Sequence, residues 1–220
     1  MMPFEIKLHY LPLAVPADAE GIARFLPFIS EARRERLLGC PSLERRKRSL
    51  YAELLLREVI ACECGLSNGE IVFSENKYGK LYLEGREHFY FNLSHTDGAV
   101  VVAVSAEEVG VDIERIRPVK PGIARRFFAP EEAAYVEEAE DGRLKRFYEI
   151  WTKKEAYVKQ LGVGFHHPPS SFSVLDQDIA DRLTTFERDG YMISVCDAKS
   201  QSKLTFLERS EKDMFFFTDL

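Results

Sequence analysis

Two short segments of this 220-residue sequence place acids and lysines at spacings that suit chemistry: residues 109–114 (VGVDIE) and residues 151–159 (WTKKEAYVK). In the first segment, apolar residues alternate with a glycine and two acids, which is the two-residue period of a strand buried on one face. Asp112 and Glu114 therefore point to the same side. Two neighbouring carboxylates repel each other unless a cation or a shared proton lies between them. A metal ion is the simplest such partner.

The second segment predicts a helix from Trp151 to Leu161, because it contains no Gly or Pro and Gly162 follows it. Glu155 and Lys159 lie four residues apart and share a face of that helix. Taken alone, they form an ordinary surface ion pair worth about 0.3–0.5 kcal/mol. Together with the two strand acids, however, Glu155 would complete an all-oxygen set, which suits Mg²⁺ better than zinc.

Several cations elsewhere in the sequence suit a phosphorylated ligand. Lys154 and Lys159 could hold phosphate oxygens that the metal does not reach, and residues 33–48 contain a cluster of arginines. For most charge runs, a solvated helix face is the correct interpretation. The functional interpretation is a local cationic patch for a phosphorylated ligand or an acidic protein partner, because guanidinium groups match phosphate oxygens in bidentate geometry.

In this order, the motifs resemble the signature of 4′-phosphopantetheinyl transferases of the Sfp type. The resemblance is carried by residues 110–114 (GVDIE), 126–132 (RFFAPEE) and 151–159, and it extends to residues 78–80 (YGK) and 91–95 (FNLSH). It implies transfer of 4′-phosphopantetheine from coenzyme A to a serine of an apo acyl or peptidyl carrier protein. It also implies a requirement for Mg²⁺, with Mn²⁺ as a substitute, the release of adenosine 3′,5′-bisphosphate, and an acidic carrier surface.

The resemblance also assigns roles to individual residues. It implies metal ligation by Asp112, Glu114 and Glu155 and catalytic roles for Glu155, Lys159 and Glu132. Glu155 is the family's usual candidate for the base that takes the serine proton; Glu132 and a metal-bound water relaying to a carboxylate are the alternatives. Contacts with coenzyme A are implied for nine residues: Arg33, Arg36, Arg48, Ser49, Lys80, Ser94, His95, Lys154 and Lys159.

The order of predicted elements indicates an α+β protein whose two halves repeat a pattern of strand, helices and several strands. Strands are predicted at residues 4–10, 71–74, 80–83, 88–93, 99–105, 109–114, 172–175, 183–187, 191–196 and 203–208, and helices at 43–64, 121–127, 130–140 and 151–161. The division is expected between residues 1–107, on the side of the coenzyme A 3′-phosphate, and residues 108–220, with the metal-binding carboxylates. The expected architecture is a pseudo-duplicated, two-lobed fold. Each half has a small, mostly antiparallel sheet packed with helices, and the active site lies in the cleft between the lobes of a monomer.

Composition excludes some classes of function. The 30 Lys and Arg residues against 36 Asp and Glu residues give a net charge of −6, which is not the electrostatic footprint of a nucleic-acid-binding protein. We expect no membrane span, because no apolar run approaches about 20 residues. We expect a cytoplasmic location, because the start of the sequence lacks the basic and apolar regions of a signal peptide and the four cysteines resemble reduced thiols. Two alternatives stay open: a noncatalytic module that docks acidic proteins through its arginines, and another Mg²⁺-dependent enzyme acting on a different phosphorylated substrate.

Overall fold

A computed structural model describes residues 5–164, 167–200, 202–212 and 214 and shows an α+β protein. Residue 4, where we expected the first strand to begin, lies outside the described residues. The strands are β1 (Glu5–Pro12), β2 (Phe73–Glu75), β3 (Leu81–Leu83), β4 (Tyr90–Thr96), β5 (Ala99–Ser105), β6 (Val109–Arg115), β7 (Leu183–Arg188), β8 (Tyr191–Asp197) and β9 (Lys203–Glu208). The α-helices are α1 (Ala19–Phe25), α2 (Glu31–Leu38), α3 (Leu43–Cys64), α4 (Ile123–Phe127), α5 (Pro130–Glu137), α6 (Arg143–Leu161) and α7 (Gln177–Ala180). Short 3-10 turns lie at η1 (Leu26–Phe28), η2 (Asn68–Glu70) and η4 (Pro169–Ser171).

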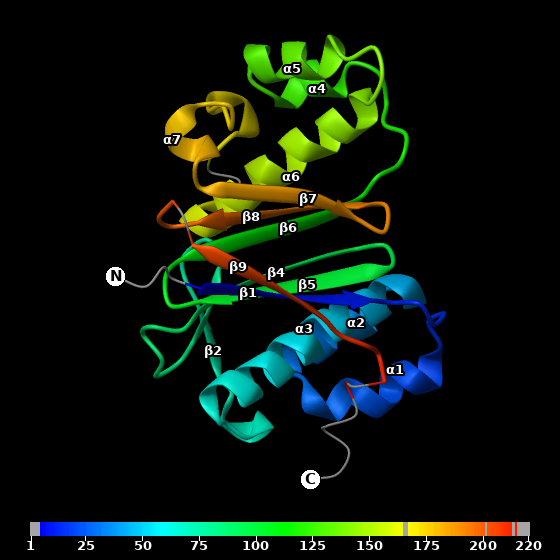
Figure 1. Cartoon of the computed structure of the whole chain (residues 1–220). Coiled ribbons are helices and arrows are strands. Elements are labelled where there is room, and N and C mark those ends of the chain that lie inside the picture. The colour runs from blue at the N-terminus through cyan, green and yellow to red at the C-terminus, as the bar shows by residue number, and fades with distance from the viewer. Residues whose placement is uncertain (1–4, 165–166, 201, 213, 215–220) are drawn as a thin grey trace.

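The strands form two larger sheets and one small hairpin. The first sheet has the order β4-β5-β1-β9, the second has the order β6-β8-β7, and β2 pairs only with β3. All pairings are antiparallel except that of β1 with β9. Figure 1 shows the two sheets stacked at the centre of the molecule, with α3 and α6 covering their opposite outer sides.

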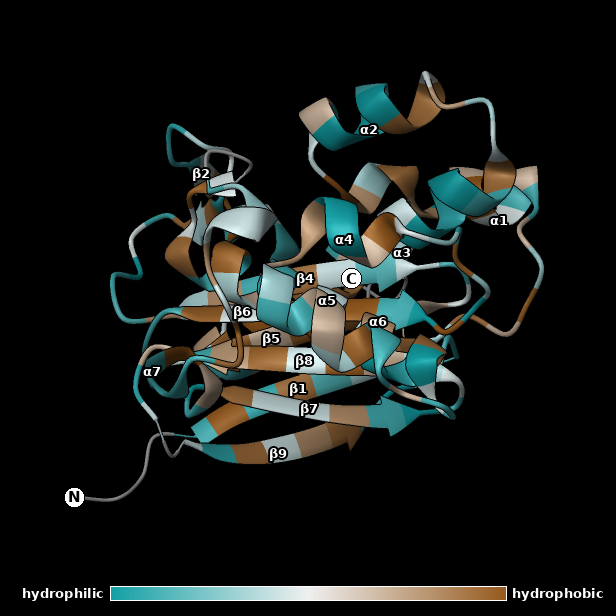
Figure 2. Cartoon of the chain, turned by 90° about the horizontal axis from the view of Figure 1, so that it is seen from above, coloured by the Kyte–Doolittle hydropathy of each residue, from teal (hydrophilic) through white to brown (hydrophobic). Residues whose placement is uncertain are grey.

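Strand β5 shows why the layers stack in this way, because all seven of its residues are buried. Val100, Val102 and Val104 lie in a hydrophobic cluster with residues of α3, whereas Ala99, Val101 and Ala103 lie in a second cluster with apolar residues of β6 and β8. Successive side chains of a strand point to opposite faces, so one strand contributes to both cores. Figure 2 shows the hydrophobic colour concentrated along these central strands.

The helix boundaries follow from local chemistry. The Ser42 hydroxyl accepts a hydrogen bond from the backbone N–H of Arg45 (3.3 Å) and caps the start of α3, and Gly65 ends that helix at φ +66°. Gly162 ends α6 in the same left-handed conformation, at φ +67°. The predicted helices at 43–64 and 151–161 are confirmed, although α6 begins earlier, at Arg143.

One sequence prediction needs correction. No strand forms at residues 172–175; this segment follows η4, and the backbone N–H of Val174 donates to the Glu132 carboxylate (2.7 Å) instead of to a neighbouring strand. The division after residue 107 stays a prediction, and β9, from the second half of the chain, pairs with β1 in the first sheet.

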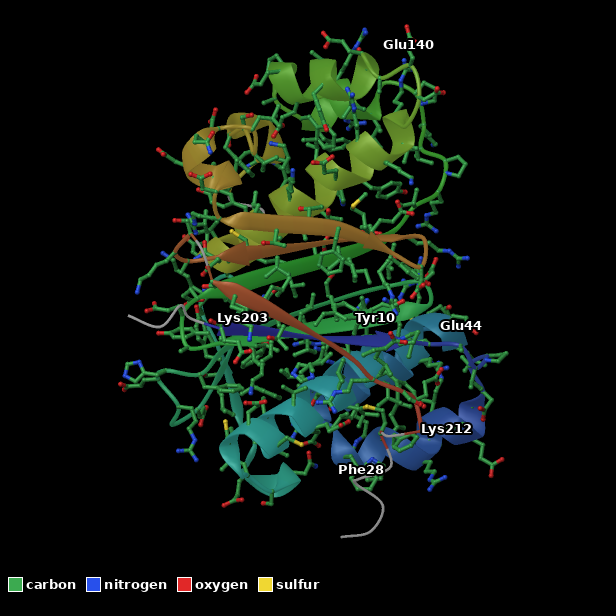
Figure 3. All side chains as sticks on the ribbon, viewed as in Figure 1. Tyr10, Phe28, Glu44, Glu140, Lys203 and Lys212 are labelled. Carbon is green, nitrogen blue, oxygen red and sulfur yellow. The ribbon has the colours of Figure 1, made fainter. Side chains whose placement is uncertain are left out.

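Residues that follow β9 also contact the first half of the chain. Glu211 forms an ion pair with Lys47 (2.6 Å), and Met214 lies in the cluster packed on α3. Figure 3 shows Lys203 at the start of β9, where it pairs with Glu5 of β1, and places Lys212 among the helices of the first half. Among the described residues, no helix is long and apolar enough to cross a membrane.

Candidate active site

The site begins with the close packing of α6 on β6. Val109, Val111 and Ile113 face the core between the sheets, which turns Gly110, Asp112 and Glu114 toward α6. A Cβ atom on Gly110 would lie 2.0 Å from the Ala156 carbonyl oxygen and 2.4 Å from the Gln160 nitrogen. Only glycine permits this approach, which brings the acids of β6 to the helix that carries Glu155 and Lys159.

Asp112 lies at the centre of a polar triangle that joins three elements. Its Oδ1 atom accepts hydrogen bonds from the Ser94 hydroxyl of β4 (2.8 Å) and from the Lys159 ammonium of α6 (2.7 Å). The Lys159 ammonium also donates to Ser94 Oγ (2.9 Å) and to the Val111 carbonyl (3.1 Å). The Oδ2 atom of Asp112 is buried and has no hydrogen-bond partner among the described residues. A buried carboxylate oxygen without a partner is costly, so it marks a place where a cation would be stabilising.

Glu114 and Glu155 share the electrostatic environment of Asp112. Burial raises the pKa of each of these carboxyl groups above the usual value, and the negative charge of Asp112 raises the pKa further. Glu114 also accepts a hydrogen bond from the Thr96 hydroxyl (3.1 Å). The three acids predicted to hold a metal are therefore electrostatic neighbours, although no group of three His, Cys, Asp or Glu side chains among the described residues has metal-binding geometry.

Glu132 and Lys154 occupy a different, fully enclosed place. They form a salt bridge of 2.7 Å, and their side chains are 0% and 1% exposed. Glu132 accepts from the backbone N–H groups of Ala129 (2.8 Å) and Val174 (2.7 Å), and Lys154 donates to the carbonyls of Pro169 (2.7 Å) and Phe172 (2.6 Å). These contacts use both carboxylate oxygens and all three ammonium protons. They favour a structural role for the pair, in which it anchors residues 169–174 to α5 and α6.

A cavity of about 350 Å³ lies beside the polar triangle. Glu155 and Lys159 of α6 line it together with Lys80 and Arg33, so four of the predicted site residues meet there. Its further lining residues are Tyr78, Gly79, Leu81, Phe91, Asn92, Leu93, Val158, Gly162, Gly164, His167 and Pro169.

A second cavity of about 410 Å³ adjoins the first, because Arg33, Gly79 and Leu81 line both. Arg36 lies in this second cavity and is largely exposed, with the Glu75 carboxylate 4.0 Å away. The predicted arginines of α2 are thus located next to the cavity that contains Glu155 and Lys159.

The arginine of the first cavity is held by Ser49, which the resemblance implied as a site residue, and by Glu53, which no motif in the sequence indicated. Arg33 donates to the buried Glu53 carboxylate (3.2 Å) and to the Ser49 hydroxyl (3.4 Å). Glu53 also accepts from Arg57 (2.9 Å) and from the backbone N–H of Ser30 (2.8 Å), where α2 begins. Glu53 and Arg57 are four residues apart on α3, and this spacing was the only signal in the sequence.

His95 lies near the remaining predicted cations. Burial, together with the positive charges of Arg48, Lys159 and Arg33, lowers the pKa of its imidazole to about 4. The Nδ1 atom is buried without a hydrogen-bond partner among the described residues. Arg48 itself forms an ion pair with Asp97 at the turn between β4 and β5. His95 is therefore neutral at pH 7 and is surrounded by cations.

Comparisons with known proteins agree with this geometry. The family model described as "4'-phosphopantetheinyl transferase superfamily" matches residues 108–208, and the model described as "4'-phosphopantetheinyl transferase, N-terminal" matches residues 16–107. The chain is 33% identical over 207 residues to 4′-phosphopantetheinyl transferase Sfp of Bacillus subtilis (strain 168), covering 88% of this chain and 92% of that protein. It is 31% identical over 208 residues to 4′-phosphopantetheinyl transferase ffp of Bacillus subtilis, covering 88% and 93%. It is also 30% identical over 168 residues to 4′-phosphopantetheinyl transferase HetI of Nostoc sp., covering 73% and 70%.

Proposed function

We propose that this chain, which belongs to the 4′-phosphopantetheinyl transferase superfamily and transfers 4′-phosphopantetheine to carrier proteins, performs the transfer at Asp112, Glu155 and Lys159 with a divalent metal ion. One observation carries the assignment of the site. The buried Asp112 has an unpartnered oxygen, and the lysine that binds its other oxygen lines a cavity together with Glu155.

Asp112, Glu114 and Glu155 would hold the metal ion. All three offer carboxylate oxygens, which are the ligands that Mg²⁺ and Mn²⁺ prefer over the softer ligands of zinc sites. Two of the acids have raised pKa values partly because of the third, so a nearby dication would relieve repulsion that is present without it. When bound, Mg²⁺ supplies charge neutralisation for the oxygens of the pyrophosphate.

Lys159 would stabilise the negative charge that builds up on the transferred phosphoryl group. Its contacts with Asp112, Ser94 and Val111 fix its ammonium group before the substrate binds, so little reorganisation accompanies the reaction. In the transfer, the serine oxygen forms a bond to the phosphorus attached to the pantetheine arm, and the bond from that phosphorus to adenosine 3′,5′-bisphosphate breaks.

Glu155 is our candidate for the base that accepts the serine proton. It lines the cavity, and burial and the charge of Asp112 raise its pKa in the metal-free protein, which favours proton acceptance. A metal ion bound directly to Glu155 would oppose this effect, because the cation stabilises the ionised carboxylate. The alternative base, Glu132, has both oxygens engaged in a buried network, and this supports Glu155 over Glu132. If Glu155 serves only as a metal ligand, the serine proton would instead pass through water to a neighbouring carboxylate.

Coenzyme A would bind through its phosphates to the cations beside the cavity. We assign the 3′-phosphate to Arg33, Arg36 and Arg48 with Ser49, and the pyrophosphate to Lys80, Ser94, His95 and Lys159. The neutral imidazole of His95 could donate one hydrogen bond to phosphate without a charge of its own. Lys154 is omitted from this set because its contacts favour a structural role.

We further propose that the molecule has two lobes, one built on each sheet, with the active site between them. The position of the polar triangle, which joins β4 of the first sheet to β6 and α6, supports this arrangement. A monomer would suffice, because residues of one chain line the whole cavity. The four free cysteines agree with a reducing compartment such as the cytoplasm.

Intact-mass measurement of a carrier protein tests the proposal. The protein is incubated with coenzyme A, Mg²⁺ and an apo acyl or peptidyl carrier protein with an acidic surface, with EDTA and Asp112→Ala as controls. We expect a mass gain of one phosphopantetheine that EDTA abolishes and that the variant lacks. A docking module would bind carriers without modifying them, and an enzyme for another phosphorylated substrate would leave every carrier unchanged.

A further inference from the structure

Asn76 makes contacts that none of the assigned roles explains. It lies in the turn between β2 and β3, and its side-chain nitrogen donates to the carbonyl of Gly162 (2.9 Å), directly after α6. Its side-chain oxygen accepts from the backbone N–H groups of Tyr78 (2.8 Å) and Lys80 (3.0 Å). One side chain therefore shapes the turn and also joins it to a helix 86 positions further along the chain.

A second side chain of the turn reaches the same helix end. The Lys80 ammonium donates to the Gln160 carbonyl (3.0 Å) and pairs with Glu108. The last carbonyls of a helix have no partners within the helix and carry partial negative charge, so donors from outside stabilise them. A Cβ atom on Gly162 would lie 2.8 Å from Lys80 Cδ and 3.2 Å from Asn76 Nδ2, so the turn packs directly on the helix end.

The two elements that Asn76 joins both line the first cavity, the one that contains Glu155 and Lys159. Tyr78, Gly79 and Lys80 line it from the turn, while Glu155 and Lys159 line it from α6. Asn76 itself does not line the cavity, so it would act on a ligand only through these lining residues.

We propose that Asn76 is a positioning residue that holds the β2–β3 turn against the end of α6 and thereby sets the width of the coenzyme A cavity. The inference rests on the proposed function, because it takes coenzyme A as the occupant. Its chemistry is a single amide-to-carbonyl hydrogen bond between two segments that have no covalent connection nearby.

The replacement Asn76→Asp separates the two tasks of this side chain. A carboxylate keeps the oxygen that accepts from Tyr78 and Lys80, but it cannot donate to the Gly162 carbonyl and is repelled by it. We expect the KM for coenzyme A to rise on the order of threefold to tenfold, the range for one lost hydrogen bond, while kcat changes less than twofold. Calorimetry with coenzyme A should show the same loss of affinity.

A matched control is Asn68→Asp, which also removes an amide donor to a backbone carbonyl, that of Phe28 (3.1 Å), and keeps an acceptor for Arg57. Asn68 lines neither site cavity, so the KM and the affinity of the Asn68→Asp variant for coenzyme A should match those of the wild type. Gly162→Ala should weaken coenzyme A binding from the α6 side of the cavity. In the double variant with Asn76→Asp, the affinity for coenzyme A should fall by less than the product of the two single fold-changes.

The results separate this inference from the proposed function. Transfer by the wild type tests the function, whereas binding of coenzyme A requires no transfer and tests the role of Asn76. The inference is overturned if Asn76→Asp binds coenzyme A as tightly as the wild type. It is also overturned if Asn68→Asp weakens binding equally, or if the wild type does not bind coenzyme A.

Discussion

Replacing Asp112 with Asn separates metal binding from folding. Asn keeps the shape of the side chain and an oxygen that can still accept from Ser94 and Lys159. The loss of the charge weakens these hydrogen bonds by about 1–2 kcal/mol. The same change removes a negative charge that raises the pKa values of Glu114 and Glu155, and this relief of repulsion opposes the loss.

The net change in the free energy of unfolding should therefore stay within about 2 kcal/mol, or about 4–8 °C in Tm for a chain of this length. Activity should fall much further. Loss of a residue that only orients a metal ligand typically costs about 10- to 100-fold in metal affinity, so loss of a ligand should cost at least about 100-fold.

The assay measures carrier modification by intact mass across a Mg²⁺ titration, and Mn²⁺ affinity by electron paramagnetic resonance, beside thermal unfolding. Asp197→Asn is the matched control, since Asp197 is another buried aspartate, whose carboxylate accepts from the backbone N–H groups of Lys199 (3.2 Å) and Ser202 (3.1 Å) at the end of β8. It should lower Tm and leave kcat unchanged. Transfer by Asp112→Asn within about tenfold of the wild type at low Mg²⁺ would show that Asp112 is not a metal ligand, and unfolding of the variant would show that Asp112 is chiefly structural.

Three further predictions concern the surroundings of the site. Glu132→Gln should lower the free energy of unfolding by about 3–5 kcal/mol in urea titrations, because it leaves the buried Lys154 without its carboxylate, while the folded fraction keeps its kcat; a large loss of kcat with unchanged stability would instead make Glu132 catalytic. Glu155→Gln should stabilise the metal-free protein above the raised pKa of Glu155, where the folded state must hold an ionised buried acid. That gain should vanish as the pH falls below the ordinary value of 4.5, and a gain that grows toward low pH would contradict the assignment. Gly110→Ala should destabilise the protein by at least about 1–3 kcal/mol, because its methyl group would lie 2.0 Å from the Ala156 carbonyl, and a wild-type Tm would show that α6 can move away from β6 without loss.

Residue spacing was sufficient to predict the local part of the site. The alternation of residues 109–114 fixed which face of β6 carries Asp112 and Glu114, and the four-residue spacing fixed that Glu155 and Lys159 share a face of α6. Both follow from the periodicities of the strand and helix backbones, which residue spacing in the sequence reflects directly. The ordered motifs also indicated the family, which the comparisons confirm.

Which charged groups meet in the site depends on the fold. Lys154 is next to Glu155 in the sequence, yet it is buried with Glu132, because adjacent residues of a helix point about 100° apart and only one of them faces the cavity. The pairing of β9 with β1 and the hydrogen bond from Asn76 to Gly162 join segments that lie far apart in the chain. Such contacts depend on how the layers stack, and no local pattern of residues encodes them.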